Sequence, residues 1–461
     1  MKSLLKVLLS ISTFFLFTSC VETGIEGAVT LGGQIDRGVD TLIVIEKKPD
    51  ALESFLGAAL TPFDTLITDA KGLFLSGTRY DSGMYEFRYQ NVSFPLYLLP
   101  GKTLNINIDV TQPRESLEFS GGLKHPNRLI RDQHQKAAAV QQRFEETQFK
   151  SVQHFMRFVD SARKSLDTLV VQFITNHPRT DKNFMQDRQQ FNYYFTGNVM
   201  LSYYENRKLA GDSIPQKLMA AIHSFPLHRD ELLNNAEYLR FARRKINLWS
   251  TSKQPGAIIT LIDSLIPGKK TKSVLALKFA RDYIYEADSL IDNEHIHLFN
   301  DVITDAEMRE RLNKTLERAA AISPGTSFAG FSGLNPDSTL RSTNEFKGKP
   351  LFIFFGVASC LECRYEFEQL RALQEKYAQT GLQMLGVGSS VGFDLWKKHI
   401  KRADYPGEAL YLNQNTSKVY DQFMISGEPH YMLIGANGII LSRNVKGDIA
   451  KQLEFLLSNP S

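Results

Sequence analysis

Cysteine and tryptophan are scarce in this sequence, and long apolar runs are absent beyond its first twenty residues. Only three cysteines and two tryptophans occur among the 461 residues. A single Cys-x-x-Cys is present, and no second pair of cysteines or histidines follows it, so a zinc site there would lack two of its usual four ligands. No stretch after residue 20 approaches the ~18 consecutive apolar residues that a transmembrane helix needs. We therefore expect no metal site at the dithiol and a chain that is soluble beyond residue 20.

An excess of charge of one sign is also lacking. The formal net charge is +4, and loss of Lys2 and Lys6 with a cleaved leader would leave 4 − 2 = +2. A balance this close to neutrality favours neither a nucleic acid nor an acidic partner. We expect no nucleic-acid partner.

The first twenty residues have the features of a secretory signal peptide. They combine a lysine-bearing start, a short apolar core and small residues before Cys20. The ending Phe17-Thr18-Ser19-Cys20 resembles a bacterial lipobox, in which the cysteine becomes the lipidated first residue of the mature chain. An uncleaved membrane anchor is the alternative, but no long polar-flanked span follows. We expect a signal peptide at 1–20 and a chain held on a cell-envelope membrane, facing the periplasm, through lipidated Cys20.

The length indicates roughly three domains at ~150 residues each, and the composition changes accordingly. Residues 21–115 predict an antiparallel β-sandwich, because short alternating or apolar runs are separated by Gly, Pro and Asp. Residues 116–322 predict a helical region with prolines at its breaks. Residues 323–461 predict a compact domain of alternating strands and helices. The expected fold class is multidomain α+β.

Two features of the helical region could be functional, and each also has a purely structural interpretation. His295 and His297 lie close together, but alternate residues diverge on a helix and no third ligand is evident, so solvated or capping histidines are favoured over a metal site. An aromatic group either lines a pocket or forms core, and its helical spacing favours core. Its members are Phe191, Tyr193, Tyr194, Phe195, Tyr203 and Tyr204.

The C-terminal domain is organised around Cys360 and Cys363, at a predicted strand-to-helix junction. Leu351–Val357 is typical of a buried strand, and Arg364–Tyr377 has the apolar spacing of an amphipathic helix. The first cysteine would lie at the helix N-terminus, where unpaired N–H groups and the dipole stabilise a thiolate. The second lies three residues later on the same face and can close a disulfide. Dithiol redox chemistry is favoured, and a structural disulfide is the alternative.

Residues 323–459 resemble the TlpA/ResA branch of thioredoxin-like proteins, which are membrane-tethered disulfide oxidoreductases of the bacterial envelope. Three motifs carry the resemblance: Phe346-Lys-Gly-Lys-Pro350, Cys360-x-x-Cys363-Arg-x-Glu366 and Ile425-x-Gly427-x-Pro429. The β-rich region before them resembles a small domain of unknown function that precedes thioredoxin domains in exported lipoproteins. The resemblance implies a thioredoxin-like α/β fold for the C-terminal domain.

The resemblance also implies roles for particular residues. Cys360 would attack as the nucleophile and Cys363 would resolve the mixed disulfide, with Glu366 as the acid that serves the dithiol. Pro429 would be held in cis beside the dithiol, and the backbone of Glu428 would pair with an extended substrate segment.

The sequence departs from the family beside the cysteines. Ser359 stands where the family usually has Trp, and Leu361-Glu362 replaces a pair that often contains Pro. A peroxidase function is not supported, because peroxiredoxins place a Thr where this chain has Val357.

The sequence therefore predicts a thiol-disulfide oxidoreductase, acting as reductant or isomerase on thiols or disulfides of envelope proteins. A membrane electron donor would reduce the dithiol again after each cycle, and the protein would need no cofactor. The alternative is a non-catalytic envelope scaffold or binding protein with a degenerate thioredoxin fold.

Overall fold

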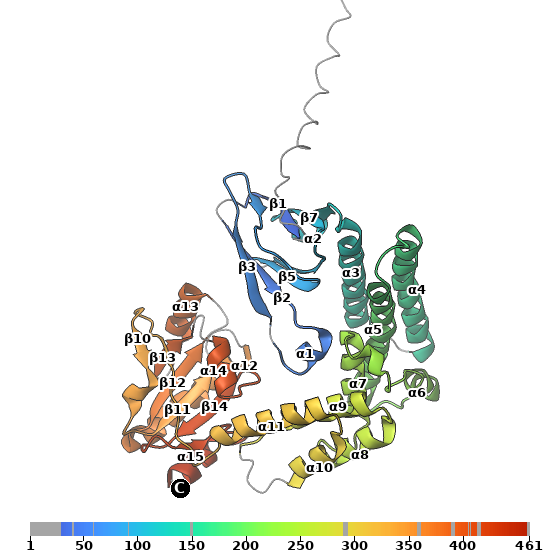
Figure 1. Ribbon diagram of the computed structural model, residues 1–461. Coiled ribbons are helices and arrows are strands. Elements are labelled where there is room, and N and C mark those ends of the chain that lie inside the picture. Colours follow the sequence, from blue (N-terminus) through green and yellow to red (C-terminus); the bar gives the residue numbers. More distant parts are fainter. Residues whose placement is uncertain are drawn as a thin grey trace, which may run out of the picture. The chain divides into compact units, whose positions relative to one another are not determined.

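The computed structural model describes most of the chain between residues 29 and 458. It does not describe residues 39–40, 59, 91, 148–150, 289–293, 357–360, 389–391, 404, 406 and 413–415, nor the side chains at 114, 294, 361–368, 378, 402–403 and 417. The fold is mixed, with helices and several sheets, and it divides into two compact units between Leu248 and Trp249 (Figure 1). Among the described residues, no helix combines the length and apolar character needed to cross a membrane.

The first unit begins with two four-stranded sheets, of order β4-β1-β7-β8 and β3-β2-β5-β6. Their strands are β1 (Thr30–Asp36), β2 (Leu42–Lys47), β3 (Thr61–Ile67), β4 (Leu73–Leu75), β5 (Gly83–Tyr89), β6 (Val92–Leu98), β7 (Thr103–Asp109) and β8 (Glu118–Ser120), with the short helices α1 (Ala51–Phe55) and α2 (Pro113–Ser116) between them. In β7, the side chains of Leu104, Ile106 and Ile108 are buried while those between them are exposed. Apolar side chains from both sheets join in one core cluster, among them Ile35, Ile43, Phe87 and Ile106.

The expectation of antiparallel pairing throughout this region is wrong for one pair. β1 and β7 run in parallel, with Leu31 opposite Leu104. Parallel partners need a long crossover rather than a hairpin, and here five strands, β2 to β6, lie between β1 and β7 along the chain. Alternation of apolar residues reports which face of a strand is buried, but not the direction of its partner. β8, which pairs with β7, also extends the strand-rich region past residue 115.

Helices complete the first unit. They are α3 (Lys124–Glu146), α4 (Val152–Asn176), α5 (Lys182–Leu209), α6 (Gln216–His223), the 3-10 turn η1 (Asp230–Leu232) and α7 (Ala236–Trp249). Side-chain caps start two of them: Ser151 accepts a hydrogen bond from the His154 backbone N–H, and Asp181 accepts one from that of Phe184.

The second unit contains further helices and a seven-stranded sheet of order β10-β9-β13-β12-β11-β14-β15. Its first helices are α8 (Pro255–Leu265), α9 (Lys269–Glu286), α10 (Glu294–Val302) and α11 (Ala306–Ala321). The strands are β9 (Ser332–Leu334), β10 (Leu340–Ser342), β11 (Leu351–Phe355), β12 (Gln383–Gly388), β13 (Glu408–Tyr411), β14 (His430–Ile434) and β15 (Ile440–Ser442). The remaining helical elements are η2 (Thr343–Phe346), α12 (Leu361–Tyr377), η3 (Ala378–Thr380), α13 (Phe393–Ala403), α14 (Thr416–Gln422) and α15 (Ile449–Ser458).

The core of this sheet surrounds β11. All five residues of β11 are buried, as are all five of β14. β11 pairs in parallel with β12 and antiparallel with β14. Buried side chains that pack on this part of the sheet include Phe352, Phe354, Trp396, Tyr431 and Leu453. A strand that is covered on both faces has apolar residues at consecutive positions. The sequence therefore predicts β11 although apolar and polar residues do not alternate along it.

A test of the β1–β7 pairing uses Gly33. Its φ is +152°, and a Cβ built there would lie 1.9 Å from the carbonyl oxygen of Ile106. Gly33→Ala should therefore lower the free energy of unfolding by about 2 kcal/mol or more, measured by urea unfolding followed by circular dichroism. Gly77→Ala is the matched control, since nothing lies within 4 Å of its added Cβ. Equal stability of the two variants would contradict the close approach of β1 and β7.

Candidate functional site

The candidate site lies at the carboxyl end of β11. The register places Phe355, the last residue of β11, opposite His430, the first residue of β14. The backbone N–H of Gly356 donates to the carbonyl oxygen of Val387, so β11 stays joined to β12 to its end. Helix α12 begins at Leu361. The start of α12 and the segment entering β14 are thus attached to the same end of one buried strand.

The structure describes part of the predicted site. Cys20 and Cys360 lie outside the described residues, so their predicted roles stay predictions. Cys363 and Glu366 lie in the first two turns of α12, where the backbone is described but these side chains are not. Glu428 and Pro429 immediately precede β14, and the peptide bond between them is cis. Helix α12 and the Glu428–Pro429 segment are therefore at one end of the sheet.

Glu428 has a partner that the sequence analysis missed. The hydroxyl of Tyr420, in α14, donates a hydrogen bond to Oε1 of Glu428. The ring of Tyr420 stands edge-on to that of Phe355, with centroids 5.8 Å apart. Tyr420 therefore connects the end of β11 to the residue before Pro429. The one signal in the sequence is its closeness to Glu428, eight positions away.

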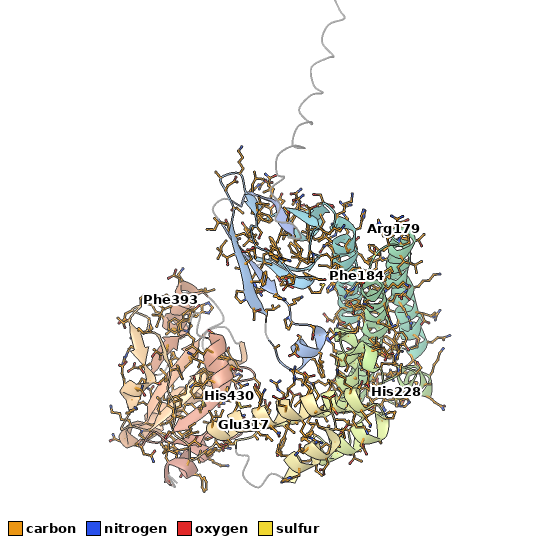
Figure 2. The ribbon with its side chains drawn as sticks, in the orientation of Figure 1. Arg179, Phe184, His228, Glu317, Phe393 and His430 are labelled. Carbon is orange, nitrogen blue, oxygen red and sulfur yellow. The ribbon has the colours of Figure 1, made fainter. Side chains whose placement is uncertain are left out.

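His430, which is labelled in Figure 2, lies on the other side of Pro429 and was also missed. Its side chain is buried. Its Nε2 lies 2.8 Å from the carbonyl oxygen of Arg443, which fixes the ring as the tautomer that donates from this nitrogen. Burial lowers the pKa of His430 to about 4, and the charges of Arg443 and Lys446 act in the same direction. The hydrogen bond to Arg443 and the charge of Glu286 oppose that shift. His430 is therefore neutral at pH 7 and acts there as a hydrogen-bond donor.

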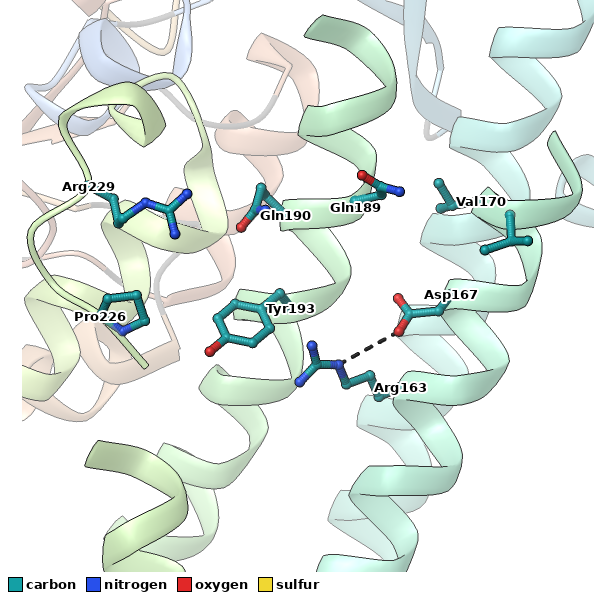
Figure 3. Close-up of a pocket in the computed structure, with 9 residues that line it drawn as sticks. Arg163, Asp167, Val170, Gln189, Gln190, Tyr193, Pro226 and Arg229 are labelled. Carbon is teal, nitrogen blue, oxygen red and sulfur yellow. Dashed lines mark ion pairs between the residues drawn. The ribbon is translucent and has the colours of Figure 1, made fainter. Parts of the chain in front are cut away.

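The aromatic group of the helical region divides between core and cavity. Tyr194, Tyr203 and Tyr204 are buried, as the helical spacing favoured. Tyr193 instead lines a cavity of about 440 Å³ in the first unit, between α4, α5 and the segment from Pro226 to Arg229 (Figure 3). The guanidinium of Arg163 lies 4.4 Å from the centre of the Tyr193 ring, and its Nε is 3.7 Å from Asp167.

The paired histidines of α10 do not join a metal cluster in the described part of the chain. His297 is exposed, and the ring of His295 stands edge-on to Tyr283. Across the residues that the structure describes, no group of three or more His, Cys, Asp or Glu side chains is arranged to hold a metal ion.

Comparison with known proteins gives matches among solved structures. No protein-family model matches the chain, and no curated protein matches it either. The thioredoxin domain of a thiol-disulfide oxidoreductase from Bacteroides vulgatus is 25% identical, covering 29% of this chain and 98% of that one, with a TM-score of 0.28. A thiol:disulfide interchange protein from Bacteroides sp. is 24% identical over 30% of this chain and 93% of its own, with a TM-score of 0.28. A thiol-disulfide oxidoreductase from Bacteroides fragilis is 22% identical over 29% of this chain and all of its own, with a TM-score of 0.27.

Over about 30% of its length, the chain is thus similar to thioredoxin-type domains of thiol-disulfide oxidoreductases. These solved proteins are of the class that the motifs in residues 323–459 predict.

The buried His430 makes stability depend on pH. The unfolded chain protonates this ring near pH 6.5, whereas the folded chain does so only near pH 4. Stability is therefore present above pH 6.5 and lost as the pH falls toward 4, by on the order of 3 kcal/mol from this ring alone. His430→Gln should remove that part of the pH dependence, measured by urea unfolding at pH 7 and pH 4.5. His297→Gln, at an exposed position, is the control, and an identical pH dependence in both variants would exclude the buried neutral ring.

Proposed function

We propose that this chain is a membrane-anchored thiol-disulfide oxidoreductase of the cell envelope, a reductant or isomerase that works through Cys360 and Cys363. The observation that carries the proposal is that α12, which contains Cys363, follows β11 at the end of the sheet where Glu428–Pro429 enters β14. Helix α12 begins directly after Cys360. Its unpaired N–H groups and dipole favour a thiolate at that position.

The proposed exchange has two balanced steps. The Cys360 thiolate attacks one sulfur of a substrate disulfide, forming a mixed disulfide and releasing the other substrate sulfur as a thiolate. Cys363 then loses its proton and attacks Cys360 in the mixed disulfide. The substrate leaves as a dithiol, reduced by two electrons, and Cys360–Cys363 remains as a disulfide. A membrane electron donor must return two electrons to the pair before the next cycle, and no cofactor on this chain is needed.

Glu366, Glu428 and Pro429 have supporting roles in this proposal. Glu366 lies one turn after Cys363 in α12, so it is spaced to accept the proton that Cys363 loses. The backbone before Pro429 pairs with an extended substrate segment, as a strand pairs with a sheet edge. The hydrogen bond from Tyr420 supports this reading because it holds the Glu428 side chain in place.

The second candidate is a non-catalytic envelope scaffold or binding protein. The cavity beside Tyr193 favours it, because an aromatic ring, two arginines and two glutamines converge there on a space large enough for a small polar molecule. The two candidates differ in their need for the dithiol: a scaffold tolerates replacement of both cysteines, and an oxidoreductase does not.

The roles of the two cysteines can be tested by trapping. Cys363→Ser leaves the nucleophile but removes the resolving thiol, so mixed disulfides with envelope proteins should accumulate. Cys360→Ser should trap far less. Both are measured as reducible high-mass bands on non-reducing gels of cells that express each variant. The double variant Cys360→Ser/Cys363→Ser gives the background, and equal trapping by the two single variants would reject the assigned roles.

The proposed anchor can be tested separately. Cys20→Ala removes the sulfur that would carry the lipid, so the variant should move from the detergent phase to the aqueous phase in a phase-partition assay. Cys363→Ser, which retains Cys20, is the control and should stay in the detergent phase. A Cys20→Ala chain that partitions like the control would refute anchoring through this residue.

A further inference from the structure

The end of helix α9 is capped by residues that follow β15, in the same compact unit. The carbonyl groups in the last turn of a helix lack partners within the helix. Here the guanidinium of Arg443 donates to the carbonyl oxygens of Ile284 and Ala287, the second at 2.7 Å. The side-chain amide of Asn444 donates to the backbone carbonyl oxygen of Glu286 at 3.1 Å. A buried cation at this end of α9 also complements the helix dipole.

Asp288, which follows the end of α9, accepts hydrogen bonds from the same segment. Its Oδ1 accepts hydrogen bonds from the Ser442 hydroxyl at 2.9 Å, from the Arg443 backbone N–H at 2.8 Å and from the Asn444 backbone N–H at 3.2 Å. Arg443 is only 2% exposed. A buried guanidinium is tolerated only when its donors are satisfied, so the positions of Arg443 and α9 depend on each other.

The same residues reach the segment around Pro429. The carbonyl oxygen of Arg443 accepts the hydrogen bond from His430, the residue after Pro429. The backbone N–H of Val445 donates to the carbonyl oxygen of Tyr431, one residue further along β14. Displacing residues 443–445 would therefore move the start of β14.

A second contact reaches the other side of Pro429. Arg318, in α11, pairs with Asp421 of α14 at 2.6 Å. The neighbouring residue, Tyr420, donates to Glu428. The end of α9 thus contacts the segment after β15, which bonds His430, and α11 contacts α14, which bonds Glu428.

We propose that Arg443 and Asp288 are positioning residues, through which helix α9 fixes the Glu428–Pro429 segment for capture of a protein substrate. This inference rests on the proposed function. It makes the helices before residue 323 part of the machinery that selects an extended polypeptide. The network acts on the segment that pairs with the substrate backbone and not on the thiols. Its loss should weaken binding of a protein disulfide while leaving the chemistry of the dithiol intact.

The test uses the full-length chain in detergent and the variant Asp288→Ala, which removes the acceptor of three hydrogen bonds. With disulfide-bonded insulin as substrate and dithiothreitol supplying the two electrons of each cycle, KM should rise about five- to tenfold, as expected for one to two lost hydrogen bonds, while kcat is retained. Single-turnover reduction of the small disulfide dithiobis(nitrobenzoate) by the pre-reduced chain should not change, because this compound has no backbone to pair. Asp288→Asn keeps a side-chain oxygen acceptor and should restore most of the affinity for insulin.

Asp263→Ala is the matched control. Asp263 pairs with Lys272 of α9 at 2.7 Å, and in the described part of the chain it does not contact the segment after β15. The KM of this variant should therefore equal that of the wild type. An unchanged KM in Asp288→Ala, or an equal loss of rate with both substrates, would overturn the proposal, since the second result is what general unfolding produces.

Hydrogen exchange separates this inference from the proposed function. In Asp288→Ala, amides of residues 425–434 should exchange faster than in Asp263→Ala. If the wild type reduces neither substrate, the proposed oxidoreductase function fails, yet faster exchange would still support positioning by α9. Unchanged exchange in that case would overturn the positioning role as well.

Discussion

The candidate site depends on the burial of one strand between two differently oriented partners. β11 is covered on both faces and pairs with β12 on one side and β14 on the other. A slip of one residue in either pairing would turn every side chain of the strand to the opposite face. That cost fixes which residue of β14 lies opposite Phe355, and hence which end of β11 the Glu428–Pro429 segment adjoins. The geometry of the site is set by apolar packing before any polar contact contributes.

Sequence pattern predicted the elements whose signal is local. The run Leu351–Phe355 is uniformly apolar and bounded by Pro350 and Gly356, and it forms β11, an interior strand of the sheet. Two other features carry a weak local signal or none. No proline or glycine marks the break between α3 and α4, where only the cap at Ser151 shows that a new helix begins. The parallel pairing of β1 with β7 depends on a long connection, and the composition of neither strand reports it.

In the candidate site, too, some residues could be predicted from local sequence and others could not. The motif residues from Cys360 to Glu366 and the Glu428–Pro429 pair were predictable because spacing and residue type carry their chemistry. Arg443 was not predictable, because its neighbours Ser442 and Asn444 make it look like part of a solvated turn. Its partners Ile284 and Ala287 lie more than 150 positions earlier in the chain. The usable signal is indirect: α9 ends at Glu286 without a glycine after it, so its last carbonyl groups need donors from elsewhere.

The contact between Arg318 and Asp421 and the contact through Arg443 and Asp288 differ in strength. Arg318 and Asp421 are 40% and 70% exposed, and ion pairs of that kind contribute ~1 kcal/mol at most. The contact through Arg443 and Asp288 is more deeply buried: Arg443 is 2% exposed, and Asp288 accepts hydrogen bonds from Ser442, Arg443 and Asn444. In a medium of low polarity such networks hold one arrangement, because partial satisfaction is costly. The buried contact, not the surface pair, therefore makes helix α9 and the sheet one structural body, although the composition of the chain changes near residue 323 and suggested a boundary there.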